Sequence, residues 1–187
     1  MRSQEEAAFR KRLDKSKDGQ WSIIITPYHI PDVQNAFIIV YYDVEDKERH
    51  NAQLVDHQTA DTFSHLRRRS ATNPAAGEMS VATRDFGAGE ILLREWPLLL
   101  MPRAFVSDYE RLKQVIETAV GALEPTRQMQ FRTLANAWRA DRSNWRGMAG
   151  DLHGIVSTNS VGLDTSPGGN ELAYGGVFPE LSKINHR

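Results

Sequence analysis

Cysteine is missing from all 187 residues of the chain. Its absence excludes disulfides, cysteine-ligated zinc and thiol nucleophiles. An excess of charge is missing too, because 23 basic residues nearly balance 24 acidic ones, and this balance predicts neither direct nucleic-acid binding nor attraction to an anionic membrane. Long apolar runs are also lacking, since Arg94, Glu95 and Pro97 interrupt the most apolar stretch, ILLREWPLLLM, and the N-terminus shows no secretory signal. We therefore expect an intracellular protein, in the nucleus or the cytoplasm.

Residues arranged for common catalytic chemistry are equally scarce. The six histidines are scattered, and none has the spacing of a metal site such as HExxH. The serines lack the G-x-S-x-G pattern of a hydrolase, and the glycines near Gly77 and Gly87 match neither a P-loop nor a dinucleotide fingerprint. The arginine cluster from Arg67 to Ser70 is interpreted as a solvated helix end rather than an import or phosphate-binding patch. These patterns predict no metal site and assign no catalytic residue.

The composition of the chain predicts a folded domain. Apolar residues make up 40% of the chain and charged residues 25%, close to the averages of soluble globular proteins, and the length suits one domain with an extension. A capping box at Ser3 predicts a short N-terminal helix, and β-rich runs from Trp21 and from Ala36 predict two strands of a hairpin. A loosely helical spacing then runs from Ala52 into the arginine cluster, and turn residues indicate a boundary near Ser70.

The second half of the sequence predicts strands first and helices next. MSVATRDF and EILLREWPLLL bracket Gly87–Gly89, which predicts two short strands around a tight turn, together a compact β unit. Helical spacing predicts one helix over residues 108–123, and Pro125 suits the first turn of the next, so a helical hairpin is expected. The segment from Leu152 onward mixes short apolar runs with turn residues and predicts short strands and turns.

Three sequence blocks resemble one known family in type and in order. GEMSVATRDFGAGEILLREWPLL, from Gly77 to Leu99, resembles the opening of a SET domain, the fold of protein-lysine methyltransferases. Its REWPLL resembles the E-x-P-L-L of the branch that combines SET and MYND modules and of its fungal relatives. STNSVGL, from Ser157, resembles the T-N-S/A-F strand of that branch. The closing GGVFPELSKINHR resembles the pattern G-x-F-P-x-x-S-x-x-N-H-S-C-x-P-N, with these residues in register: Gly176, Phe178, Pro179, Ser182, Asn185 and His186.

The resemblance implies a cofactor, S-adenosylmethionine, and residues that hold it. The G-x-G turn, here Gly77, Glu78 and Met79, is expected to bend the backbone against the cofactor, with Met79 departing from the second glycine. Asn185 is expected to hold the methionine end, and the backbone around His186 is expected to read the adenine. Asn159 resembles another asparagine that contacts the cofactor, while the alternative interpretation is an asparagine that satisfies turn backbone.

The resemblance also implies an α+β fold: an incomplete SET domain of short strands with an inserted helical pair, preceded by an N-terminal extension. Residues 1–70 are predicted to be that extension, of unknown role, and residues 71–187 the N-terminal part of the SET domain, with the helical insert at about 105–150. The insert has no MYND zinc finger, since the chain has no cysteine to bind zinc. We expect the sequence to stop within the N-H-x-C motif, before the strand that carries the family's catalytic tyrosine.

The function implied is S-adenosylmethionine-dependent methylation of a lysine on a protein substrate, histone or non-histone, by a chain that is inactive alone. Nucleic acid, membrane and zinc are not expected as partners. Two alternatives remain open from the sequence. One is a non-catalytic SET-derived module for protein interaction, suggested by Met79. The other is a truncated gene product without activity, whose unpaired strands would leave exposed edges.

Overall fold

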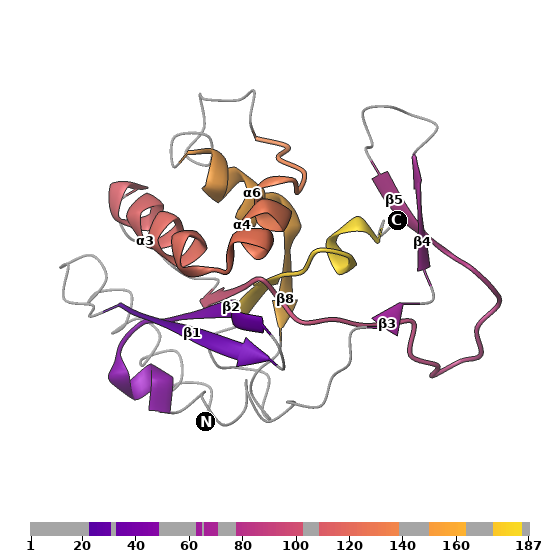
Figure 1. Cartoon of the computed structure of the whole chain (residues 1–187), viewed down its shortest axis with the longest axis horizontal. Helices are drawn as coiled ribbons and strands as arrows, with labels where there is room; N and C mark the ends of the chain where they lie inside the picture. Colours follow the sequence, from indigo (N-terminus) through magenta and orange to yellow (C-terminus); the bar gives the residue numbers. More distant parts are fainter. Residues whose placement is uncertain are drawn as a thin grey trace, which may run out of the picture.

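The computed structural model describes residues 23–30, 33–48, 63–64, 66–70, 78–102, 109–138, 150–163 and 174–184. Their main body is a five-stranded sheet in the order β1-β2-β7-β9-β8, covered on one face by helices (Figure 1). The strands of this sheet are β1 (Ile24–Ile30), β2 (Val33–Tyr41), β7 (Leu99–Pro102), β8 (Ser160–Leu163) and β9 (Tyr174–Val177). β2 and β7 are parallel and the other pairs antiparallel. The expected α+β class is therefore confirmed.

The hairpin predicted before residue 42 is confirmed. β1 and β2 pair antiparallel, with Ile24 opposite Tyr41 and Tyr28 opposite Phe37. The strands are longer than expected, because the proline-containing stretch between them is itself mostly strand. Pro27 is tolerated in β1 because this strand is at the edge of the sheet, where a missing N–H breaks no ladder on the outer side. Both strands thus belong to the same sheet as β7, β8 and β9.

β2 is the centre of the hydrophobic core. Every residue from Ala36 to Tyr42 is buried, as expected for a near-continuous apolar run covered on both faces. Alternate side chains divide between two clusters: Ile38, Val40 and Tyr42 pack with the helices. Phe37, Ile39 and Tyr41 pack on the opposite face with Leu100 and Tyr174.

The helical layer agrees with the sequence in its first part. α3 (Tyr109–Ala122) and α4 (Pro125–Arg132) occupy the expected positions, and Glu124 caps α4 by accepting from the Arg127 N–H. The second part differs: α6 (Asp151–Asn159) is a helix where turns and strands were expected. Sequence periodicity missed it because Asp151, Gly154 and Ser157 interrupt its apolar positions. α3 contacts β2 and α6, so the three helices form one layer.

Four short strands form an arm beside the main body (Figure 1). They are β3 (Phe63–Ser64), β4 (Leu66–Ser70), β5 (Glu78–Ala82) and β6 (Leu93–Arg94). β3 pairs with β6 and β4 with β5. The helical expectation is therefore wrong from Phe63 onward, and the arginine cluster is a strand, because pairing with β5 overrides its weak helical spacing.

The compact β unit expected around Gly87–Gly89 is also wrong. The runs on either side of the turn do not pair with each other: β5 pairs with β4, whereas β7 joins the main sheet. The tight turn itself is present, and Gly89 has φ +83°, a conformation that favours glycine. The predicted N-terminal helix lies outside the described residues.

No helix among the described residues is long and apolar enough to cross a membrane. Within the same ranges, no group of histidine and acidic side chains is arranged to hold a metal ion.

Candidate functional site

Three segments that are far apart in the sequence converge at one end of the main sheet. The Leu98 N–H donates to the Val177 carbonyl at 2.7 Å, and Ser160 lies opposite Val177 in the β8–β9 ladder. The three segments therefore meet around Val177: the end of REWPLL, the end of STNS and the start of VFPELS. All three resembled the same family in sequence. We call this region the junction.

Glu95 ties the first of these segments to the last. Its carboxylate accepts from the N–H of Glu180 at 2.8 Å and from the N–H of Leu181 at 2.9 Å. These N–H groups lie at the start of the 3-10 helix η2 (Leu181–Lys183), whose N-cap residue, Glu180, makes no side-chain cap hydrogen bond. Because the first N–H groups of a helix lack acceptors within the helix, Glu95 supplies an acceptor that the turn itself does not offer.

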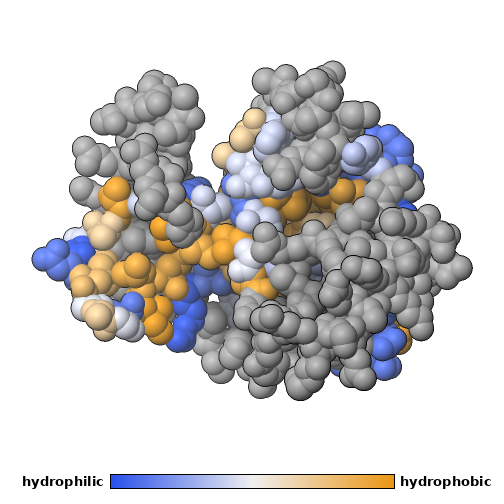
Figure 2. All heavy atoms as spheres, turned by 180° about the vertical axis from the view of Figure 1, so that it is seen from behind, coloured by the Kyte–Doolittle hydropathy of each residue, from blue (hydrophilic) through white to orange (hydrophobic). Residues whose placement is uncertain are grey.

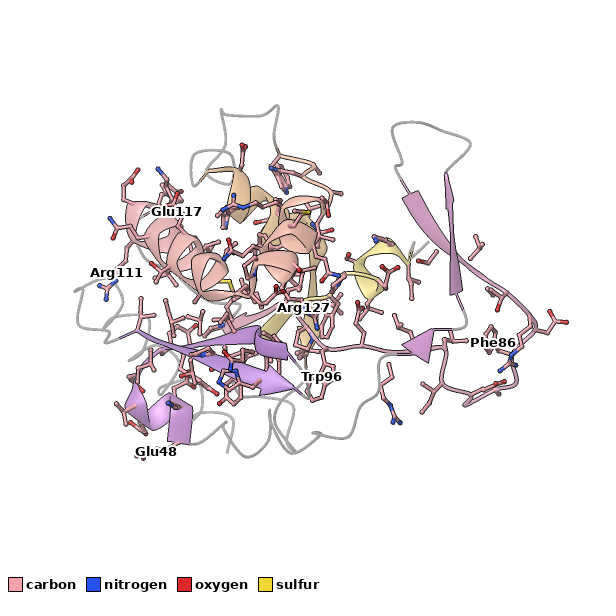
Figure 3. The ribbon with its side chains drawn as sticks, viewed as in Figure 1. Glu48, Phe86, Trp96, Arg111, Glu117 and Arg127 are labelled. Carbon is pink, nitrogen blue, oxygen red and sulfur yellow. The ribbon has the colours of Figure 1, made fainter. Side chains whose placement is uncertain are left out.

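The Glu95 carboxylate is largely buried, and its charge is partly balanced. Burial raises the pKa of Glu95 above its ordinary value, while the N–H groups of Leu181 and Glu180 oppose this rise. Lys183, which pairs with Glu180 at 3.1 Å, and Arg127 of α4 supply positive charge near the carboxylate. Arg127 is itself half-buried, and burial lowers its pKa. Figure 3 shows Arg127 beneath α4, near the segment that carries Trp96.

Trp96 anchors the segment that carries Glu95 to β2. Its ring stacks on Phe37 of β2 with centroids 5.4 Å apart, and Phe37 in turn stacks on Tyr28 at 5.2 Å. Leu98 then donates to Val177 and accepts from the Ile38 N–H at 3.1 Å. The backbone that carries Glu95 is thus fixed by aromatic stacking and by hydrogen bonds to two strands.

β5 lies against η2, which brings the first sequence block next to the last. Glu78 and Met79, both predicted to contact the cofactor, are in this strand, opposite Ser70 and Arg69 of β4. Met79 is in extended backbone, which any residue adopts, so its place at the second glycine position carries no penalty from a positive φ.

The turn after β5 explains the spacing of the ATRD and GE motifs. Glu90 forms an ion pair with Arg84 and also accepts from the Gly87 N–H at 3.1 Å. The Arg84 guanidinium lies 4.3 Å from the centroid of the Phe86 ring. Nearby Ile91 and Leu92 are exposed, and apolar surface is visible on this arm in Figure 2. The motif closes a solvent-exposed turn and contributes no group to the junction.

Asn159 is buried at the end of α6, next to β8. Its side-chain Nδ2 donates to the carbonyls of Ala135 and Ile155, both at 2.7 Å. Neighbouring Thr158 accepts from the Ala137 N–H at 3.0 Å. The side-chain amide of Asn159 thus bonds one carbonyl after α4 and one carbonyl of its own helix, α6, and its donor hydrogens are committed to these two contacts. A role in cofactor binding stays a prediction and would rest on its carbonyl oxygen.

Three other predicted cofactor residues, Gly77, Asn185 and His186, lie outside the described residues. The chain is described up to Ile184, whose N–H donates to the Leu181 carbonyl. Further back, packing favours glycine at position 176, because a Cβ there would clash with the ring of Phe178. The G-x-F-P pattern therefore describes a phenylalanine folded over the strand that precedes it.

Sequence reasoning missed Glu95 and Arg127. A signal for Glu95 was present, because an acidic residue inside an otherwise apolar stretch is expected to have a buried partner or a functional role. Arg127 gave no signal, since a basic residue near the start of a helix with mixed charges is ordinary.

No family model matches the chain, and comparisons with curated proteins and with solved structures likewise find no match.

Proposed function

We propose that this chain carries the cofactor-binding side of a SET-domain protein-lysine methyltransferase. The observation that supports the proposal most strongly is the junction. Three blocks that resemble the SET and MYND branch in order also meet in space, through Leu98, Val177 and Ser160. A chance resemblance in separate loops would give no reason for them to converge.

The proximity of two described elements supports S-adenosylmethionine as the cofactor. β5, with Glu78 and Met79, and η2, which leads into Asn185, lie next to each other. Main-chain groups of β5 would lie against the cofactor. The amide of Asn185, which has both donor and acceptor atoms, would hold its amino-acid end. The cofactor would supply the methyl group for a neutral lysine amine of a protein substrate.

Binding of S-adenosylmethionine by residues 1–187 is the decisive measurement, since no residue of this chain is assigned to the methyl-transfer step. We expect isothermal titration calorimetry to show saturable binding that S-adenosylhomocysteine competes away. The substitution Asn185→Ala should weaken this binding strongly, because it removes the whole side-chain amide of the motif asparagine. Asn170→Ala, outside all three blocks, is the matched control and should bind as the wild type does.

Absence of binding by the folded wild-type chain would refute the proposal. It would favour the second candidate, a non-catalytic interaction module of the same fold, which the substitution of Met79 for a motif glycine suggests. A methyl-transfer assay with histones and bulk protein complements the calorimetry. We expect no turnover by residues 1–187, and incorporation of label into protein would contradict the expectation that the chain is inactive alone.

A further inference from the structure

We propose that Glu95 is a positioning residue for the cofactor site, holding η2 against β5, the strand that carries Glu78 and Met79. This inference rests on the proposed function and deepens it. Glu95 is separated from Glu180 by 85 positions, yet its carboxylate accepts from the N–H groups of both Glu180 and Leu181. The N-cap residue, Glu180, provides no side-chain cap of its own.

A carboxylate suits this position because the start of a 3-10 helix needs a hydrogen-bond acceptor. Its first N–H groups lack partners within the turn, and a short 3-10 helix has weak internal hydrogen bonds. η2 therefore depends on an external acceptor to keep its direction. Hydrogen bonds from N–H groups to an ionised carboxylate are shorter and stronger than neutral ones.

The carboxylate is held from its own side as well. Trp96 stacks on Phe37, and Leu98 is hydrogen-bonded to both Ile38 and Val177. The segment that carries Glu95 is thus fixed to the sheet, whereas η2 is a single short turn. Without Glu95, the contact between η2 and β5, the strand that carries Glu78 and Met79, would lose its fixed geometry.

The groups around Glu95 favour a negatively charged side chain at this position. Arg127 faces it from α4, while Lys183 and Glu180 face it from the segment that it caps. Lys183 is itself paired with Glu180 at 3.1 Å. The carboxylate therefore sits between one half-buried cation and a helix start.

The test compares Glu95→Ala, Glu95→Gln and the control Glu117→Ala, which removes an exposed glutamate of α3. Hydrogen exchange of the amides of Glu180 and Leu181, read by NMR or mass spectrometry, reports the cap, and calorimetry with S-adenosylmethionine reports the site. Loss of the two hydrogen bonds in Glu95→Ala should speed exchange at these amides and weaken cofactor binding, each by about tenfold to a hundredfold. Glu95→Gln keeps one acceptor oxygen and should recover part of both effects.

The readouts separate this inference from the proposed function. A wild-type chain that binds no S-adenosylmethionine refutes the proposed function and, with it, the positioning role. Wild-type binding that Glu95→Ala leaves unchanged overturns the positioning role alone. Faster exchange confined to residues 178–184, with weaker binding and recovery in Glu95→Gln, supports it. If Glu95→Ala does not fold, the same comparison between Glu95→Gln and the wild type decides, with a smaller expected change.

Discussion

The buried contact between Tyr174 and Asp46 predicts a large stability effect from a small change. Asp46 follows β2 in the helical segment 44–48 and is buried, accepting at Oδ2 from the Tyr42 N–H at 2.9 Å and from the Tyr174 hydroxyl at 2.7 Å. Tyr174→Phe removes only the hydroxyl. A hydrogen bond to a charged group is worth about 1.5–3 kcal/mol, so we expect a loss of that size in the free energy of unfolding.

Urea denaturation followed by tryptophan fluorescence measures this loss, and the slope m should stay unchanged. For a chain of this length the same loss lowers the melting temperature by about 3–12 °C. Tyr28→Phe is the matched control, because its hydroxyl bonds the neutral hydroxyl of Tyr41 at 3.0 Å and should cost only about 0.5–1.5 kcal/mol. If Tyr174→Phe costs no more than Tyr28→Phe, the reasoning about a buried carboxylate is refuted.

Two further predictions concern the pH dependence of stability and the packing around two glycines. Burial, reinforced by the charge of Asp46, raises the pKa of Tyr174 above its ordinary value of 10.0; the stability linked to the protonated hydroxyl is therefore full below about pH 10 and lost as the pH rises further. The urea midpoint should fall above that pH in the wild type and fall less in Tyr174→Phe, and equal falls would contradict the assignment. Gly176→Ala should cost about 1–3 kcal/mol through overpacking against Phe178 and Leu100. Gly121→Ala, where a Cβ meets nothing within 4 Å, should instead be neutral or stabilising by up to about 1 kcal/mol in α3, and thermal melting of both variants checks the contrast.

Local patterns in the sequence predicted the elements that local physics determines. The apolar run AFIIVYY became β2, and the helical spacing before Leu123 became α3. Where partner choice decides, the sequence was less informative. The arginine cluster forms a strand only because β5 lies beside it, and β7 pairs with β2 rather than with the run on the other side of its turn.

The candidate site, too, could be predicted from the sequence only in part. Resemblance selected the blocks that meet at the junction, but it could not show which atoms hold them together. Asn159 resembled a cofactor-contacting asparagine, and its Nδ2 donates to the Ala135 carbonyl after α4, a contact that the motif did not predict. Glu95 was noted only as a break in an apolar stretch. Its partners are 85 positions away, and no periodicity or local propensity reaches that far.

The N-terminal strands bear on the site through a chain of backbone hydrogen bonds. The Ile38 N–H of β2 donates to the Leu98 carbonyl, and the Leu98 N–H donates to the Val177 carbonyl. A shift of β2 along the sheet would therefore displace Leu98, and Leu98 would displace the start of the segment that leads to η2. Because β2 is buried on both faces, its register is strongly specified. Residues before position 70, whose role the sequence patterns left open, thus contribute to the geometry from which Glu95 reaches its partners.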